Sequence, residues 1–376
     1  MNDHIEYIVF GSEHYNPLGI IRSLGEAGIS PIAVIVRSNR PFASKSKYIK
    51  KLHLVDSIVE GYTLIQSTYN SHNPNCKSII LTGGDDATSI LDIHFDELKD
   101  GFIFQNAGKK GRITHYMDKK AINELAKEKG FDVLENVVLH KDDDIPDLEY
   151  PVITKSISSN AGGKKDVFIC HDKEELTEAF SKIKSDPVLV QKYIYKKNEL
   201  CLDGFSINKG RDVVITMATD YKYILEDSYS QYMNMYSYDD HKVIRILTNM
   251  LTEIGYEGIF TIEFLVDKND NLHFLEINLR NSGWSYACTC VGMNMPVLWS
   301  DAMIKGRIAS DAIKHIPEGS TAMADLDDFR VRVRRKKMNI FKWYHDFKKC
   351  TSVFYYNKMD KKPLFLLLLS RVIRIR

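Results

Sequence analysis

Residues 261–280 read TIEFLVDKNDNLHFLEINLR, and this stretch decides the fold class more than any other in the chain. Apolar residues dominate both of its halves, and Asn269-Asp270 between them is a favoured two-residue turn. The stretch therefore predicts a β-hairpin. With a two-residue turn at that point, Glu263 lies directly opposite Glu276 on the neighbouring strand.

The predicted hairpin gathers acidic and amide side chains on one face. Because side chains alternate along a strand, Glu263, Glu276 and Asn278 share a face, and Arg280 follows on it if the strand continues. Two facing carboxylates repel each other, and a divalent cation between them removes the repulsion. Carboxylate and amide oxygens without Cys or His suit Mg²⁺ that also holds nucleotide phosphates. The alternative is a solvated charged face on an exposed hairpin.

A second polar cluster follows another predicted strand. Residues 151–156 read PVITKS, and a lysine in an otherwise apolar strand needs an anion to offset its desolvation. The next loop, residues 158–165, reads SSNAGGKK, and its small residues let backbone N–H groups close over phosphates. The GxxxxGK[ST] phosphate loop is absent. A plain β-turn at the two glycines is the alternative. The candidate nucleotide contacts here are Lys155, Ser158, Ser159, Gly162 and Gly163.

The N-terminal third has the pattern of a parallel sheet. Strands are expected at Ile5–Phe10, Pro31–Val36 and Ser78–Leu81. A helix between the first two predicts an α/β fold, whereas the missing GxGxxG argues against a dinucleotide site. Asp85 and Asp86 follow the third strand at the sheet edge where ligands bind. They are candidates to face a substrate amine, unless one of them caps a helix at residues 87–91.

The middle of the chain predicts a second α/β unit. Asp118 can cap a helix over residues 119–129, and Gly130 suits the left-handed position that ends it. Further strands are expected at residues 151–156, 167–170 and 187–194, antiparallel strands over 200–225, helices at 174–183 and 239–254, and the hairpin at 258–278.

Composition places the chain among globular proteins. Its 376 residues are 44% hydrophobic and 27% charged, which suits two or three units with buried cores. The N-terminus reads as a strand and not as a signal peptide, and the six cysteines are scattered. We therefore expect a cytoplasmic protein with free thiols, no zinc site and no nucleic-acid partner.

The last part of the chain differs in charge from the rest. Residues 331–376 carry 14 Lys and Arg against Asp346 and Asp360, a net charge of +12 that leaves −11 for residues 1–330. The apolar block at residues 364–369 is too short to span a bilayer. A short helix over residues 364–376 can instead lie in the interface of an anionic membrane. The alternative is a helix docked on the protein itself or on another subunit.

Taken in order, these motifs resemble the ATP-grasp ligases over roughly residues 1–300. The resemblance implies an N-terminal parallel-sheet domain followed by two α+β subdomains that clasp ATP. It implies that Lys119 and Lys155 bind the phosphates, with Lys120 as a competing position for the first. It also implies that Glu199 accepts from the ribose hydroxyls. The segment that resembles the adenine-binding hinge contains Gln191, Lys192, Tyr193 and Ile194.

The same resemblance implies a metal site and a reaction. The positions matching Glu263, Glu276 and Asn278 bind one or two Mg²⁺ ions, for which Mn²⁺ can substitute. The position matching Arg280 meets the acyl phosphate or the substrate carboxylate, although Leu279 stands where the family usually has proline. The stretches NSGW at 281–284 and GMNMP at 292–296 are similar to carboxylate-amine ligases of the D-aspartate ligase group. Those ligases often act on cell-wall or surface-polymer precursors.

The expected activity is ATP-dependent joining of a small-molecule carboxylate to an amine through an acyl phosphate, with Lys155 and Arg280 as catalytic residues. One substrate is expected to be lipid-linked if the C-terminal helix binds the inner face of the membrane. A small-molecule kinase and a non-catalytic ATP-binding protein are the alternatives, and an oligomer is left open. The expected domains are residues 1–115, 116–190 and 191–310, followed by a basic extension over residues 311–376.

Overall fold

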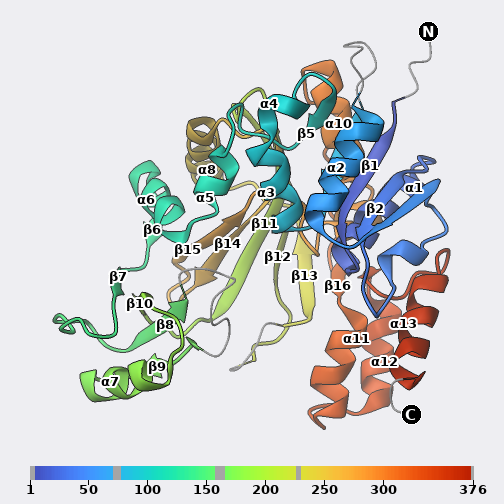
Figure 1. The fold of residues 1–376 in the computed structure, drawn as a ribbon. Helices are drawn as coiled ribbons and strands as arrows, with labels where there is room; N and C mark the ends of the chain where they lie inside the picture. Colours follow the sequence, from blue (N-terminus) through green and yellow to red (C-terminus); the bar gives the residue numbers. More distant parts are fainter. Residues whose placement is uncertain (1–4, 71–77, 157–165, 226–229, 374–376) are drawn as a thin grey trace. The chain divides into compact units, whose positions relative to one another are not determined.

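The computed structural model describes residues 5–70, 78–156, 166–225 and 230–373 (Figure 1). The chain forms two compact units. Unit 1 comprises Met1–Thr114, Leu200–Ile262 and Ile277–Arg376, and unit 2 comprises His115–Glu199 and Glu263–Glu276.

Unit 1 begins with a five-stranded sheet of order β3-β2-β1-β4-β5, in which every neighbouring pair is parallel. In the centre, Ile8 lies opposite both Ile32 and Ile80. This confirms the predicted α/β class and the strands expected in the N-terminal third. The strands are β1 (Tyr7–Ser12), β2 (Ile32–Val36), β3 (Lys51–Val55), β4 (Ser78–Thr82) and β5 (Phe102–Phe104).

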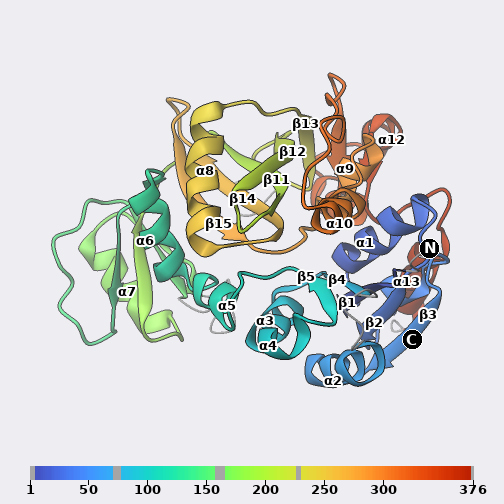
Figure 2. The same ribbon diagram turned by 90° about the horizontal axis from the view of Figure 1, so that it is seen from above.

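Helices cover both faces of this sheet, since its strands are apolar on both sides. In β1, Ile8 and Phe10 pack in a cluster with α2 and α3, whereas Tyr7 and Val9 pack in a cluster with α1 and α10. Figure 2 shows α1 and α2 on opposite faces of the sheet. The elements of this region are α1 (Tyr15–Glu26), η1 (Ala43–Lys45), α2 (Ile58–Tyr69), α3 (Asp85–Ile93), α4 (Phe95–Leu98) and α5 (Arg112–Tyr116).

A second sheet has the order β17-β16-β13-β12-β11-β14-β15-β6. The antiparallel pairing of β11 with β12 confirms the strands predicted over residues 200–225. The strands are β6 (Asp132–Val133), β11 (Asn198–Ile207), β12 (Asp212–Tyr221), β13 (Tyr232–Tyr236), β14 (Gly258–Val266), β15 (Leu272–Asn278), β16 (Thr321–Met323) and β17 (Ser352–Val353).

The C-terminal part of unit 1 is helical, and its last helix docks on the protein. Leu367 is buried in a cluster that includes Phe42 and Tyr355, and Leu364 packs against that cluster. Within the described residues, no helix is both long and apolar enough to cross a bilayer. The elements are α8 (His241–Ile254), α9 (Tyr286–Cys290), α10 (Met295–Lys305), α11 (Asp325–Asp328), the π-helical η3 (Phe329–Arg334), α12 (Ile340–Lys349) and α13 (Lys362–Ile373).

Unit 2 contains a four-stranded sheet of order β7-β10-β8-β9. The Asp118 side chain accepts from two backbone N–H groups at the start of α6, and Gly130 ends that helix with φ 107°, as predicted. An apolar cluster that includes Leu176 of α7 and Val188 of β10 forms its core. The elements are α6 (Lys119–Lys129), β7 (Asn136–Leu139), β8 (Val152–Ser156), β9 (Ile169–Cys170), α7 (Lys173–Lys182) and β10 (Val188–Lys192).

The hairpin of β14 and β15 forms as predicted, but its turn is one residue longer than expected. The backbone N–H of Asp267 donates to the carbonyl oxygen of Asn271 at 3.1 Å. Asp270 adopts φ 66°, a left-handed conformation that Asp tolerates better than most residues. The loop is therefore Lys268–Asp270, and the prediction of a two-residue turn at Asn269-Asp270 is wrong.

Candidate active site

Lys155 is a half-buried cation in the middle of β8. Its backbone pairs with Leu189 of β10 in antiparallel register. Its Nζ donates to Oε1 of Gln191 at 2.8 Å, and Gln191 is itself buried. Gln191 was expected in the adenine-binding hinge, and the structure brings its side chain to Lys155, which was expected to bind phosphates.

Three other candidate residues lie close enough to Lys155 for their charges to act on it. The pKa of Lys155 is lowered from 10.5 to about 8, chiefly by burial and also by the positive charge of Lys119, while Glu276 and Glu199 oppose the shift. Lys155 is thus a poorly solvated cation near a second positive charge, and the neighbouring carboxylates compensate it only in part. Such a surplus of positive charge fits a polyphosphate anion, which would restore the charge of Lys155.

The remaining hinge residues are the last residue of β10 and the two that follow it. The backbone N–H of Lys192 donates to Glu135 and that of Tyr193 to Pro151, both at 2.8 Å, so this segment is fixed to its neighbours. Ile194 follows it, half-buried. Glu199 is buried and accepts from Lys196 Nζ at 2.5 Å, so the proposed ribose acceptor already has a cationic partner.

The predicted phosphate loop cannot be placed. Ser158, Ser159, Gly162 and Gly163 fall between residues 157 and 165, outside the described residues.

Unit 2 also holds a pocket of about 680 Å³ between α6 and the sheet. Lys120 and Lys192 line it, together with Val152 and Val190. Because side chains alternate along a strand, Val190 and Lys192 project from the face of β10 opposite to Gln191. This pocket is therefore separate from the group around Lys155.

The predicted metal ligands lie on both strands of the hairpin, Glu263 in β14 and Glu276 and Asn278 in β15. Glu276 lies near Lys155, and Asn278 follows two residues later on the same side of β15. Next to the longer turn, however, Asp267 lies opposite Asn271, and an unbroken ladder in that register sets Glu263 opposite Leu275. Glu263 and Glu276 then point to opposite faces, so a shared ion requires one extra residue in β15, a β-bulge.

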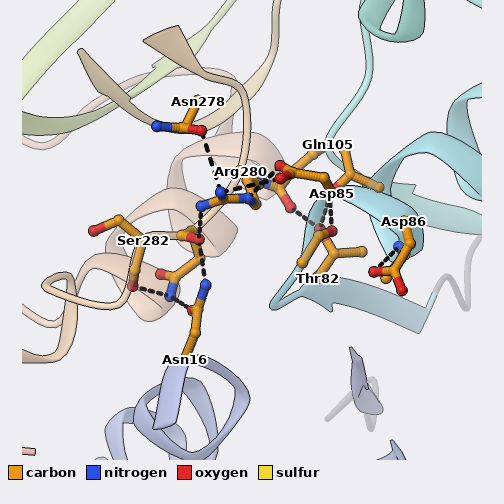
Figure 3. A network of polar contacts seen from close by, with 12 residues as sticks. Asn16, Thr82, Asp85, Asp86, Gln105, Asn278, Arg280 and Ser282 are labelled. Carbon is orange, nitrogen blue, oxygen red and sulfur yellow. Dashed lines mark hydrogen bonds and ion pairs between the residues drawn. The ribbon is translucent and has the colours of Figure 1, made fainter. Parts of the chain in front are cut away.

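In unit 1, Arg280 pairs with Asp85 at the start of α3, a contact that the sequence did not predict (Figure 3). Its Nε and Nη2 donate to the two carboxylate oxygens of Asp85 at 2.5 and 3.3 Å, and Nη2 also donates to Asn278 Oδ1 at 3.2 Å. The Arg280 side chain is 18% exposed and that of Asp85 is 59% exposed. A bidentate carboxylate partner fixes both the plane and the direction of a guanidinium group.

Asp85 is the first residue of α3, which starts two residues earlier than predicted. Its N-cap residue is Gly84, which has no side chain with which to cap the helix. Asp86 accepts only from the adjacent N–H of Ala87, at 2.8 Å. The sequence had left open whether one of the two aspartates caps this helix, and neither does. Asp85 instead lies just beyond the carboxyl end of β4.

The loop after Arg280 is anchored at two points, which the sequence did not reveal. Asn281 and Asn16 of α1 form reciprocal amide hydrogen bonds, in which Asn16 Nδ2 donates to the Asn281 carbonyl at 2.7 Å and Asn281 Nδ2 donates to Asn16 Oδ1 at 2.5 Å (Figure 3). Since Asn281 adjoins Arg280, this pair fixes the backbone from which the guanidinium extends.

The second anchor is Asp203 in β11, which is fully buried. Its Oδ1 accepts from the hydroxyls of Ser282, Thr261 and Ser285 at 2.7, 2.8 and 3.1 Å. Burial raises the pKa of Asp203, and these three hydroxyls oppose the rise. Because it accepts from hydroxyls of both segments, the buried Asp203 side chain links the 281–285 loop to strands β11 and β14.

Comparison with known proteins finds a family model that matches part of the chain. The family model described as "ATP-grasp domain" matches residues 124–291. Among curated proteins, the carbamoyl phosphate synthase large chain of Clostridium botulinum is 25% identical over 230 residues. That match covers 51% of this chain and 21% of the relative, so the chain spans about a fifth of the relative's length.

Solved structures share the fold. The L-amino acid ligase from Bacillus licheniformis has a TM-score of 0.63 at 13% identity, over 84% of this chain and 78% of that one. The biotin carboxylase domain of Hydrogenobacter thermophilus 2-oxoglutarate carboxylase, in complex with MgADP, ADP and bicarbonate, has a TM-score of 0.60 at 18% identity. It covers 84% of this chain and 73% of its own.

Proposed function

We propose that this chain, whose residues 124–291 match the ATP-grasp domain model, is an ATP- and Mg²⁺-dependent ligase that joins a carboxylate to an amine through an acyl phosphate. The observation that supports the proposal most is the lowered pKa of Lys155, which lies half-buried near the positive charge of Lys119. Keeping Lys155 charged in this place costs stability, and a bound polyphosphate offsets that cost. The bound nucleotide of one structural relative, MgADP, has this chemistry.

The two lysines act on the phosphates. Transfer of the γ-phosphoryl group to a carboxylate brings two anions together, so Lys119 and Lys155 neutralise oxygens that crowd in the transition state. Bound Mg²⁺, held by Glu276 and Asn278 and by Glu263 if β15 carries a bulge, would supply further charge neutralisation. Most of the catalysis in this scheme is positioning and electrostatics.

Arg280 receives the substrate carboxylate in this scheme. The Asp85 carboxylate occupies its guanidinium in the free protein, much as a substrate carboxylate would. An incoming acid that takes this position leaves Asp85 beside it, exposed and negative, and able to accept hydrogen bonds from an amine. Asp85 is thus our candidate for amine recognition.

The bonds change in two steps. A carboxylate oxygen bonds to the γ-phosphorus while the bond to ADP breaks. The amine nitrogen then bonds to the carbonyl carbon, phosphate leaves with the former carboxylate oxygen, and the nitrogen loses a proton. Arg280 stays directed at the carboxyl group throughout, because the Asn16–Asn281 pair and Asp203 hold its loop.

The similarity of residues 281–284 and 292–296 to D-aspartate ligase-like enzymes favours an amino acid and a cell-wall or surface-polymer precursor as substrates. The test is a phosphate-release screen with ATP and Mg²⁺ over pairs of amino acids and amines, including sugar amines and wall precursors. We expect one pair to release phosphate in step with amide formation. Glu276→Gln should abolish this turnover, with a milder effect of Glu263→Gln. A fully active Glu276→Gln variant would remove the hairpin from the metal site.

A further inference from the structure

In the segment after residue 330, both aspartates are paired with arginines and most basic side chains are exposed. Asp360 is fully buried, where it pairs with Arg22 of α1 at 3.1 Å. Asp346 pairs with Arg332 at 2.8 Å. All Lys and Arg residues from 334 to 362 are exposed. The surface of this segment is therefore more uniformly positive than its net charge implies.

Helix α12 has one face that packs on the protein and one that does not. On the packed face, Trp343 Nε1 donates to Asp328 at 2.8 Å, and the Trp343 ring stacks on Phe347 with centroids 5.4 Å apart. On the other face, Phe341 is 81% exposed. Tyr344, whose ring stacks on Phe347 with centroids 6.3 Å apart, lies between the two faces and is 51% exposed. No other large hydrophobic side chain among the described residues is as exposed as Phe341.

Helix α13 has the same two-sided character. Leu364 and Leu367 pack in the core, whereas Phe365 is 64% exposed and Leu368 is 42% exposed. Lys361 and Lys362, at its first turn, are also exposed. The docked helix that the sequence offered as one alternative thus leaves an apolar face uncovered, and the two alternatives are compatible.

We propose that the exposed faces of α12 and α13 bind the surface of anionic lipid membranes. Helices with aromatic and aliphatic residues on one side and a dense basic surround lie in the interface of such bilayers. Anionic headgroups match the positive surface, and Phe341 and Phe365 reach toward the acyl boundary. Both helices lie at the same end of unit 1 (Figure 1). This proposal does not depend on the ligase reaction.

Flotation of the intact chain with lipid vesicles tests it. We expect the protein to float with vesicles of phosphatidylcholine and phosphatidylglycerol at low salt, to be released by high salt, and to ignore pure phosphatidylcholine. Phe341→Asp and Phe365→Asp should each reduce the bound fraction about tenfold, because each removes a large inserted side chain. Val59→Asp is the matched control, since Val59 is 63% exposed on α2 and should not matter.

Three results would overturn the proposal. The first is an intact protein that stays unbound with anionic vesicles at low salt, and the second is an equal loss with Val59→Asp. The third is a Phe341→Asp variant that loses only concentration-dependent self-association, which would make this surface an interface between copies. Because the substituted side chains are exposed, thermal melts should be unchanged. Turnover of water-soluble substrates by these variants should also be unchanged, which separates this test from that of the ligase activity.

Discussion

Replacing Lys155 with methionine should make the free protein more stable and the enzyme inactive. The pKa of Lys155 falls from 10.5 to about 8 on folding, a shift that corresponds to roughly 3 kcal/mol of unfavourable free energy when the lysine is charged. Methionine removes that cost. It also leaves Gln191 without its 2.8 Å partner, a loss of about 1 kcal/mol. The net expectation is a gain of about 2 kcal/mol at neutral pH.

The gain should depend on pH with a definite sign. Between pH 8 and 10.5 the unfolded chain holds a proton on Lys155 that the folded chain has lost, so wild-type stability rises with pH across this window. The advantage of the methionine variant is therefore full below pH 8 and disappears above 10.5. Nucleotide binding reverses the preference, since phosphates favour the charged lysine. The variant should bind ATP more weakly by about 1.5–3 kcal/mol.

Urea unfolding at pH 7 and near pH 10.5, with calorimetric titration of ATP, measures both effects. Lys182→Met is the matched control, because Lys182 is an exposed lysine of unit 2 that pairs only with exposed Glu178. It should change neither stability nor ATP affinity by more than a few tenths of a kcal/mol. A Lys155→Met variant that is less stable than wild type at pH 7, or an advantage that persists at high pH, would refute the assigned environment. Unchanged ATP affinity would remove Lys155 from the nucleotide site.

Two further predictions concern unit 1. Asp203→Asn keeps the side chain's shape but weakens the hydrogen bonds that Asp203 accepts from Ser282 and Ser285. We therefore expect kcat to fall, while the Kd for ATP, measured by calorimetry, stays within about twofold. Asp360→Asn leaves Arg22 buried without its anion, and urea unfolding should show a loss of about 3–5 kcal/mol. Asp270→Asn, which breaks an exposed pair with Lys197, should cost at most about 1 kcal/mol. Equal costs for these two substitutions would contradict the burial of the Arg22–Asp360 pair.

Local signals predicted the elements well. The α6 helix begins at its Asp118 cap and ends at Gly130 as expected, because side-chain capping and a left-handed glycine are decided by a few neighbouring residues. Strand β8 was identified from its apolar residues, and the lysine within it proved to be a poorly solvated cation. The turn of the β14–β15 hairpin was missed by one residue, since both two- and three-residue loops accept its polar sequence.

Long-range partners could not be predicted in the same way. Arg280 and Asp85 are 195 positions apart, and Asp203 joins segments 58 and 79 residues away. No periodicity links such residues, so only the fold reveals the pairings. The exposed face of α12 was also not predicted, because aromatic residues such as those of this helix are equally common in protein cores. Only the contacts of Trp343 show which side of the helix is packed.

The most direct test of the proposed reaction follows oxygen from the carboxylate. Once the screen has identified a substrate pair, the acid is supplied with ¹⁸O in its carboxyl group, and the released phosphate is analysed by mass spectrometry. Attack of the carboxylate on the γ-phosphorus predicts that each amide formed transfers one labelled oxygen to phosphate. Amide formation with unlabelled phosphate would contradict the acyl-phosphate route. ATP consumption that yields a stable phosphorylated product and no amide would contradict ligation altogether.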